Sequence, residues 1–297
     1  MAIEQLIKTS FTETFKDEMW EGLAAGKLLD PKYKSAIQYG DEIVIPFDGM
    51  VTMSDYTGGD LDKTSVEYAT TTSVRVKINH GKSVFFKLDD AKIRQIQAAK
   101  TQKEQYQLAS QYSKDAKEQF QRAINAACCK EYVRAGHKIT GSAGAAVIVT
   151  GDNLAKLFAV VTAKLQRGDG KGHTAWSEGN MLAIVSPEMH GLMSTMGILQ
   201  YSDVLAKNYK TGYKGSFMGF DVIMDNNLAK DSSGNEYPLF GRAKRTIAGG
   251  IQDDFTLESG KEVGGFDTQY WGKGVFGVKT PLSYQLATVK ASVTLSL

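Results

Sequence analysis

The stretch that decides the fold runs from residue 82 to residue 135 and reads KSVFFKLDDAKIRQIQAAKTQKEQYQLASQYSKDAKEQFQRAINAACCKEYVRA. It contains no glycine and no proline, and it is rich in Gln, Lys and Ala, which are good helix formers. We predict one helix from about Asp89 to Arg134. At 1.5 Å per residue this helix extends on the order of 70 Å, far beyond the usual three or four turns.

The apolar residues of this helix form a thin, interrupted stripe. A helix at the centre of a bundle needs a broader apolar face. Two interpretations fit the pattern, an exposed helix on an ordinary α+β protein or a brace along a thin plate that joins other thin plates. The second explains the length better, because a compact monomer has little use for such a helix. The stripe consists of Ile93, Ile96, Tyr106, Tyr112, Phe120, Ile124 and Tyr132.

Composition describes a globular protein with little net charge. The chain has 297 residues, 42% of them hydrophobic, and 35 basic residues stand against 33 acidic ones, which gives a net charge of +2. This balance gives no overall field that would predict tight nucleic-acid binding. Cys128 and Cys129 are the only cysteines. Neighbouring helix positions point in different directions, so we expect buried fillers and a reducing compartment, not a disulfide.

The N-terminal segment predicts an amphipathic helix that docks on protein. Apolar residues recur every four positions and end near Gly22 or Gly26. Acidic residues in the same segment oppose a membrane-surface role, since they repel anionic lipid. The chain has no secretory signal pattern and no apolar run of about 18 residues, so we predict a soluble protein made in the cytoplasm, with no membrane partner. The apolar positions are Ile3, Ile7, Phe11, Phe15 and Met19.

The next segment predicts strands and a long two-stranded ribbon. A short apolar strand from Gly40 to Phe47 is closed by Pro46, and a turn follows at Gly58-Gly59. From Thr64 to Ile78, apolar residues alternate with Thr, Arg and Lys, as in a ribbon with one wet face. An isolated ribbon is marginal in water, so its stability must come from other surfaces.

A compact α/β region follows the long helix. We predict a strand at Ala146–Val149, then a helix capped by Asp152 or Asn153 and stopped by Gly168. Leu154, Leu157, Phe158, Val161 and Leu165 share one face of that helix.

The region continues with a second strand and helix. A buried strand at Met181–Val185 leads to Ser186 as N-cap and Pro187 at the first helical position. Met189, Leu192, Met193 and Met196 form a stripe that we interpret as core packing. From Phe217 onward we predict strands and turns, ending with the alternation of Leu286, Val289, Val293, Leu295 and Leu297.

The motifs that could carry phosphate or calcium chemistry are incomplete. Gly81-Lys82-Ser83 ends like a phosphate-binding loop but lacks the upstream glycine, which is Val76. Gly168–Gly172 lacks the third glycine of a dinucleotide fingerprint and is interpreted as a loop. The spacing of Asp60 and Asp62 matches the start of a calcium-binding loop. The glycine and the glutamate that such a loop needs further along are missing.

The titratable residues predict no catalytic, cofactor or metal site. His80, His137, His173 and His190 are far apart in sequence, and none has a second ligand at metal spacing. Asp89-Asp90 suits a helix N-terminus and Asp253-Asp254 suits a turn. We therefore predict that the chain is not an enzyme and needs no cofactor.

The order of these parts resembles the major capsid proteins of tailed bacteriophages with the Hong Kong 97 fold, in the branch without a fused protease. Each matching stretch by itself has only the residue pattern of strands and turns. Their shared order along nearly the whole chain is more specific. The stretches are Tyr39–Pro46, Asp55–Gly59, Val74–Ile78, Phe86–Asp90, Leu182–Pro187, Gly215–Val222 and Phe266–Pro281.

The resemblance implies an α+β fold with five parts. These are an N-terminal arm (residues 1–48), an extended loop (49–88), a peripheral domain with the long spine helix (89–138), an axial domain (139–245) and return strands that complete the core (246–297). The arm and the ribbon would gain order by lying across neighbouring subunits.

The resemblance also implies the partners and the location. The subunit would form hexamers and pentamers in an icosahedral shell around double-stranded DNA, which it would contact non-specifically. Because the sequence begins at Met1, we expect a separate scaffolding protein, together with a portal and decoration proteins. The shell would assemble in the bacterial cytoplasm. Some family members crosslink subunits through a loop lysine and a neighbour's asparagine. This chain has lysines in that region at Lys63, Lys77, Lys82 and Lys87, but we interpret them as the solvated face of a ribbon and assign no crosslink to them.

Two other hypotheses remain open at the level of sequence. One is an encapsulin-like compartment with the same fold, which encloses an enzyme and captures it through a peptide groove. The other is a soluble enzyme or a monomeric binding module, which would stay at the 32.4 kDa chain mass.

Overall fold

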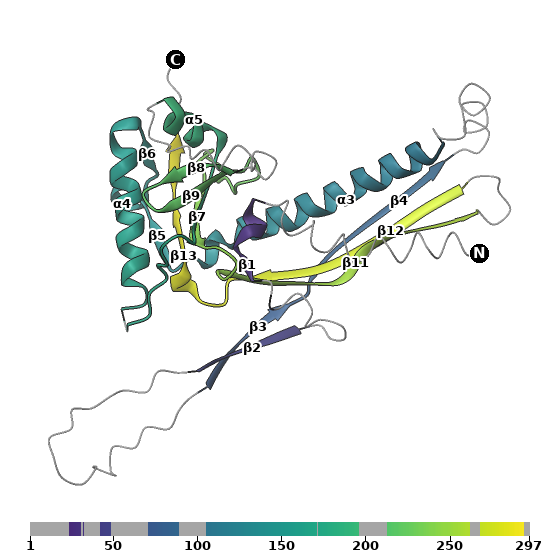
Figure 1. Cartoon of the computed structure of the whole chain (residues 1–297), viewed down its shortest axis with the longest axis horizontal. Helices are drawn as coiled ribbons and strands as arrows, with labels where there is room; N and C mark the ends of the chain where they lie inside the picture. The colour runs from purple at the N-terminus through teal and green to yellow at the C-terminus, as the bar shows by residue number, and fades with distance from the viewer. Residues whose placement is uncertain are drawn as a thin grey trace, which may run out of the picture.

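The molecule is elongated, with a compact region at one end and a long plate at the other (Figure 1). The computed structural model describes residues 24–30, 32, 42–48, 71–88, 105–170, 172–195, 213–261 and 268–293. The predicted helix of residues 3–19, the turn at Gly58-Gly59 and the first part of the predicted long helix, residues 89–104, lie outside the described residues.

The long helix is confirmed where it is described. It comprises α3 (Gln105–Lys130) and a 3₁₀ turn, η5 (Glu131–Arg134). Such a turn is common at the end of an α-helix. Its buried face is built largely from small residues, and Tyr112, which the sequence places in the apolar stripe, is exposed. Cys128 and Cys129 are free and buried, as predicted. The buried apolar residues are Ala116, Phe120, Ile124, Ala127, Cys128 and Cys129.

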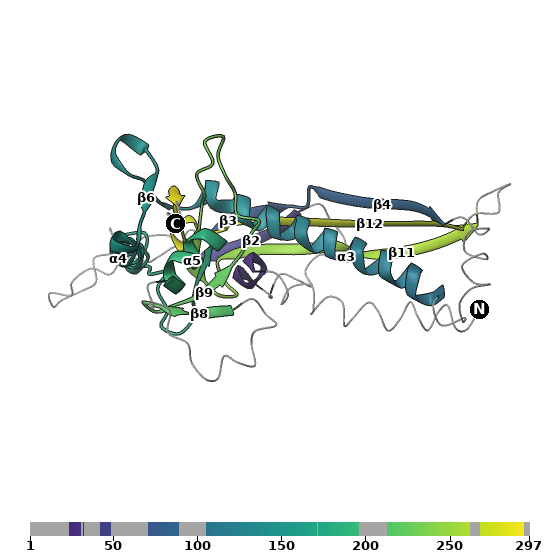
Figure 2. The ribbon, with the colours of Figure 1, turned by 90° about the horizontal axis from the view of Figure 1, so that it is seen from above.

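A four-stranded sheet runs alongside α3 and forms the plate (Figure 2). Its order is β1 (Leu29–Asp30), β11 (Ile247–Lys261), β12 (Thr268–Lys279) and β4 (His80–Leu88), and β12 is antiparallel to both neighbours. The helix approaches β12 closely, because a Cβ on Gly274 would lie 2.5 Å from the Phe120 ring. Glycine on the strand and small residues on the helix therefore let one helix cover one face of the sheet.

The acidic pair Asp253-Asp254 is not in a turn, so that prediction is wrong. Both residues belong to β11, where the pairing with β12 shifts register between Ile251 and Asp253 and again between Asp253 and Thr256. Such shifts are β-bulges, which add a residue to one strand and locally disrupt its hydrogen bonds. The polar pair thus interrupts the regular pairing of a strand that continues on both sides.

A separate hairpin projects from the plate (Figure 1). Its strands are β2 (Glu42–Asp48) and β3 (Thr71–Lys77), which pair in antiparallel register. Pro46 does not end β2, contrary to prediction. Among the described strands β2 pairs with β3 alone, and an edge strand tolerates a missing N–H. The strand pairing also crosses the predicted division at residue 49, since β2 joins β3 while β4 pairs with β12.

The compact region is built on a six-stranded sheet whose order is β5-β13-β10-β7-β9-β8. β7, the predicted strand Met181–Val185, is buried at every position, as expected for a strand covered on both faces. The other strands are β5 (His137–Ile139), β8 (Tyr213–Phe217), β9 (Phe220–Met224), β10 (Leu239–Arg242) and β13 (Leu286–Val289). Two short 3₁₀ helices, η6 (Ser142–Gly144) and η9 (Ser283–Gln285), lie in the connections. β6 (Val147–Val149) and β14 (Ala291–Val293) form a separate parallel pair.

Two helices cover one face of this sheet. α4 (Gly151–Arg167) begins earlier than predicted, because Thr150 is its N-cap. The Thr150 backbone N–H donates a hydrogen bond to Asn153 Oδ1 at 2.9 Å. Gly168 ends α4 as predicted, with φ 58°, and a Cβ there would overlap the His173 carbonyl oxygen. α5 (Pro187–Thr195) starts at the predicted cap, where the Met189 N–H donates to Ser186 Oγ at 3.2 Å.

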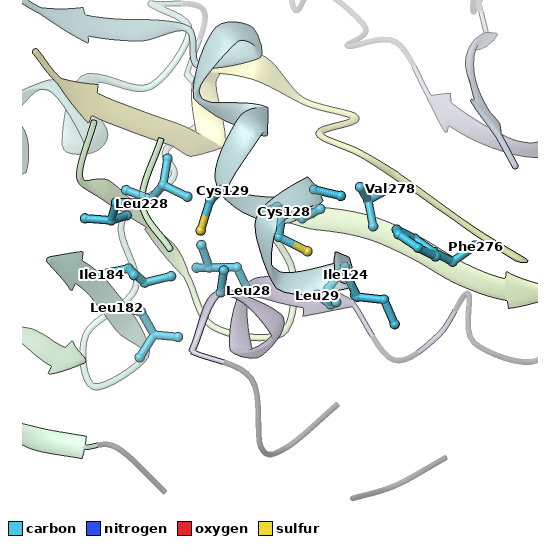
Figure 3. Close-up of a cluster of buried hydrophobic side chains, with 14 of the residues drawn as sticks. Leu28, Leu29, Ile124, Cys128, Cys129, Leu182, Ile184, Leu228, Phe276 and Val278 are labelled. Atoms are coloured by element: carbon cyan, nitrogen blue, oxygen red, sulfur yellow. The ribbon is translucent and has the colours of Figure 1, made fainter. Parts of the chain in front are cut away.

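The opposite face of the compact sheet is covered by the end of α3 and by η1 (Ala25–Leu28) (Figure 3). Leu182 and Ile184 from β7 share this core with Cys128, Cys129 and Leu28. The same core continues into the plate through Phe276 and Val278 of β12 (Figure 3). The compact region and the plate are therefore joined through continuous apolar packing.

Candidate assembly surface

The face of the plate turned away from α3 carries two neighbouring aromatic side chains. Phe85 of β4 and Trp271 of β12 are register partners, so their side chains lie side by side on the same face. Phe85 is 61% exposed and Trp271 is 39% exposed. We call Phe85, Trp271 and the adjacent Glu258 the outer aromatic patch.

Trp271 is held in place by its neighbours. Its indole Nε1–H donates to the Glu258 carboxylate at 3.0 Å, and Glu258 is its register partner on β11. A Cβ on Gly260 would lie 2.7 Å from the indole ring, so the ring rests over the glycine backbone. The exposed aromatic surface is therefore preorganised, because neither the ring position nor the polar N–H needs a further partner.

The adjacent residues face the opposite way and are used inside the subunit. Phe86 stacks on its register partner Tyr270, with ring centroids 5.0 Å apart, and its ring centroid lies 5.4 Å from that of Tyr112 on α3. Phe85 and Phe86 thus have different roles, because successive residues of a strand point to opposite faces of the sheet. Phe86 contributes to the contact with the helix, and Phe85 is left on the outside.

The β2–β3 hairpin is also two-faced. Ile43, Ile45 and Val76 are buried and pack with Ala248 of β11. On the other side Val44 is 54% exposed, and Glu42 forms ion pairs with Arg75 at 3.5 Å and with Lys77 at 3.6 Å. The outer aromatic patch and the exposed face of the β2–β3 hairpin therefore both present apolar groups beside charges. This combination is typical of surfaces that contact protein.

The candidate motifs stay apart in the structure. His80 lies on β4 and stacks on Phe276, His137 lies on β5, His190 lies on α5, and His173 contacts Asp169 at 2.7 Å in the loop after α4. Gly81-Lys82-Ser83 is part of β4. Across the described ranges, no three His, Cys, Asp or Glu side chains are grouped to hold a metal ion.

The remaining sequence candidates divide between residues outside the described ranges and the two buried cysteines. Asp60, Asp62, Asp89, Asp90 and Lys63 lie outside the described residues. Burial is the main cause that raises the pKa of both the Cys128 and the Cys129 thiols, so they stay neutral and poorly nucleophilic. No helix in the described part of the chain has the length and apolarity to cross a bilayer.

The outer aromatic patch is a feature that sequence reasoning missed. Phe85 and Trp271 are separated by a long stretch of sequence, and only the register of β4 on β12 brings them together. The signal that could have found it is the Phe85-Phe86 dipeptide in a strand with one covered face, because one of the two rings must then face outward.

Comparison with known proteins finds the same architecture in solved phage capsids. No protein-family description and no curated protein matches the sequence. A structure from Mycobacterium phage Che8 matches with a TM-score of 0.65 and 20% identity over 90% of both chains. The capsid of Ralstonia phage GP4 matches with a TM-score of 0.64 and 11% identity over 91% of both chains.

A third match extends the same result. The capsid structure of the cyanophage P-SCSP1u matches with a TM-score of 0.63 and 13% identity, over 87% of this chain and 85% of that one. At these identities the likeness concerns the fold. The chain has the α+β fold of these phage capsid subunits, so the predicted Hong Kong 97-type fold is confirmed.

Proposed function

We propose that this chain is the major capsid protein of a tailed bacteriophage, a structural subunit that assembles into an icosahedral shell and has no enzymatic role. The observation that carries the proposal is the preorganised aromatic patch, which is exposed on the face of the plate opposite α3, beyond the end of that face on which the β2–β3 hairpin packs. Such a surface is of little use to a monomer, because exposed apolar patches favour association. The match over 85–91% of the phage structures supports the same conclusion.

The mechanism is repeated association between unlike surfaces of identical subunits. The outer aromatic patch and the projecting β2–β3 hairpin are different surfaces, so contacts between them are heterologous, and heterologous contacts form rings when the rotation closes. Hexamers and pentamers are the rings that an icosahedral shell needs. Each subunit then makes several moderate contacts, and their combination gives a shell more stable than any single interface.

The proposal includes the division of labour along the chain. Residues 1–48 act as the arm, 49–88 as the extended loop, 89–138 as the peripheral domain, 139–245 as the axial domain and 246–297 as return strands. The partners we propose are a separate scaffolding protein, a portal, decoration proteins and packaged double-stranded DNA, contacted non-specifically. Assembly takes place in the bacterial cytoplasm, and the mature location is the virion.

The experiment is to purify the full chain and to examine it by sedimentation velocity and negative-stain microscopy, alone and with its scaffolding protein. We expect rings or closed shells. A species that stays at the 32.4 kDa chain mass at high concentration with scaffold present would overturn the proposal. Particles from the natural source should contain genome-length DNA, whereas a single co-purifying enzyme would point to a compartment shell.

A further inference from the structure

Three parts of the chain meet at a small polar cluster inside the otherwise apolar joint between plate and compact region. They are η1, which follows the first 24 residues, the C-terminal part of α3, and the turn after β9. The cluster centres on Asn125 of α3 and Asp225, which are 3% and 5% exposed. Buried polar groups of this kind need defined partners, since an unpaired one is costly.

The hydrogen bonds connect the three parts in a fixed order. The backbone N–H of Ala25 donates to Asn125 Oδ1 at 3.0 Å, and Asn125 Nδ2 donates to Asp225 Oδ2 at 2.6 Å. Asp225 Oδ1 accepts from the backbone N–H of Asn227 at 2.8 Å and from its Nδ2 at 3.2 Å. One amide side chain therefore links the backbone of η1, at Ala25, to the carboxylate of the compact region.

The carboxylate determines the orientation of the Asn125 amide. Asp225 can only accept when ionised, so Asn125 must present its NH₂ group to Asp225 and its oxygen to Ala25. Cys129 adds a fourth donor to Asp225, with Sγ 3.7 Å from Asp225 Oδ2, and burial raises the pKa of this thiol, so it keeps its proton. The backbone N–H of Ala25 can only donate, so the direction of the hydrogen bonds along the link is fixed from that end as well.

A polar cleft of about 360 Å³ opens beside the cluster, at the point where the chain enters η1. Ala24 lines this cleft, together with Glu118 and Arg122 of α3 and with Asn226 and Asn227 of the turn. The apolar side of η1 is secured by Ala25 and Leu28, which are fully buried. Apolar burial is non-directional, whereas a hydrogen bond is directional, so the polar contact selects the orientation of the backbone at Ala25.

We propose that Asn125 and Asp225 are positioning residues that set the direction in which residues 1–24 leave the body of the subunit, and thereby set the geometry of assembly. This inference rests on the proposed capsid function and adds a joint to it. The η1 segment stays docked through its apolar contacts when the joint is broken, but the arm starts in a different direction. Shell geometry then changes while the subunit remains folded.

The principal test exchanges the two side chains. Asn125→Asp places a second carboxylate at hydrogen-bond distance from Asp225, and we expect closed particles to fall by about tenfold or more, because like charges in contact are strongly unfavourable. In the double variant N125D/D225N, the carboxylate introduced at position 125 accepts from both the Ala25 N–H and the amide introduced at position 225, so the link from Ala25 to position 225 is restored. The weak donor Cys129 loses its acceptor in this variant. We expect this swap to recover particles of wild-type shape.

Asn125→Ala is the second variant, because it removes the link without adding charge. Hydrogen exchange at the Ala25 amide reports the joint directly, and we expect protection to be lost in N125D and N125A and recovered in the swap. Thr288→Val serves as the matched control. It removes a buried hydrogen bond to the Pro238 carbonyl in the compact sheet, outside the cluster, and should leave particle shape unchanged.

The outcomes separate this inference from the proposed function. If the wild-type chain forms no assembly, the capsid function itself fails. If the wild type assembles and folded N125A or N125D gives particles of unchanged shape and yield, the positioning role is overturned. Failure of the swap to restore Ala25 protection would likewise overturn it, whereas altered particles with rescue by the swap support it.

Discussion

The two larger sheets in the described part of the chain differ in how much of each face is covered. In the compact region, α4 and α5 pack on one face of the six-stranded sheet while η1 and the end of α3 pack on the other. In the plate, α3 covers one face and the β2–β3 hairpin packs on the other face at Ala248, while Phe85 and Trp271 further along that second face stay exposed. The compact region therefore completes its own core, whereas the plate keeps apolar surface available for neighbouring subunits.

The difference is visible in the strand sequences. β7 reads MLAIV and is apolar at every position, as a doubly covered strand requires. β4 and β12 alternate instead between residues that meet α3 and residues that face outward. Stability and assembly are thus encoded in different regions, so mutations should affect one with little effect on the other.

The largest effect on folding is expected from the doubly covered core. Phe240 is fully buried and meets Phe158 and Phe220 edge to face, at centroid distances of 5.3 and 5.7 Å. Phe240→Ala should lower the free energy of unfolding by about 3–5 kcal/mol, because the cavity cannot collapse among rigid rings. Urea denaturation of the unassembled subunit measures this, and a loss below about 1 kcal/mol would contradict a sealed core.

A smaller effect is expected where the plate joins the compact region. Glu131 is buried in η5, accepts the Thr280 backbone N–H at 2.7 Å and pairs with Arg134. Glu131→Ala should cost about 1.5–3 kcal/mol in unfolding free energy, since a buried N–H loses a charged acceptor. Glu131→Gln, which can still accept that hydrogen bond, should cost less. Equal losses for the two variants would mean that the Thr280 contact contributes nothing.

Phe85 and Phe86 give the sharpest test of the comparison, because they are adjacent and face opposite ways. Phe86→Ser should destabilise the subunit by about 2 kcal/mol or more through lost packing on Tyr112 and Tyr270. Phe85→Ser should change subunit stability by less than about 0.5 kcal/mol, as for an exposed position.

Assembly should respond in the opposite order. We expect Phe85→Ser to abolish or distort particles at a temperature where the subunit is fully folded, as judged by circular dichroism and sedimentation velocity. Normal particles from the Phe85 variant would show that the outer aromatic patch is not an interface. The Phe86 variant is the control, because its assembly defect should disappear once its fold is stabilised by lower temperature.

The smallest effect is expected from a surface turn in the compact region. Hydrogen bonds from the Asn235 side chain, at 2.9 Å, and from backbone N–H groups lower the pKa of Asp231 to about 2. A carboxylate with a lowered pKa stabilises the fold above its ordinary value of 3.8, and this contribution disappears as the pH falls toward about 2.

The matching measurement compares the wild type with Asp231→Ala across this pH range. The melting temperatures should differ slightly at about pH 6, and the difference should shrink as the pH falls from about 4 to about 2. A difference that stays constant over that interval would rule out a titrating contribution from Asp231.

The sequence predicted a helix or strand well where the residues that determine it lie within that element or directly beside it. The absence of glycine and proline predicted α3, the run of five apolar residues predicted β7, and Ser186-Pro187 predicted the start of α5. The cap of α4 was misplaced because Asp152 and Asn153 are themselves good caps. Thr150 takes that position through the reciprocal hydrogen bond with Asn153.

The sequence by itself determined the helix, the strands and the alternation that leaves one strand face wet, because propensity and periodicity act between residues close along the chain. Only the tertiary structure decided that Phe85 meets Trp271, that β2 pairs with β3, and that Asn125 links Ala25 to Asp225. These contacts join residues far apart in sequence. Their partners are chosen by strand register and by the packing of α3 on the sheet, and no local pattern specifies either.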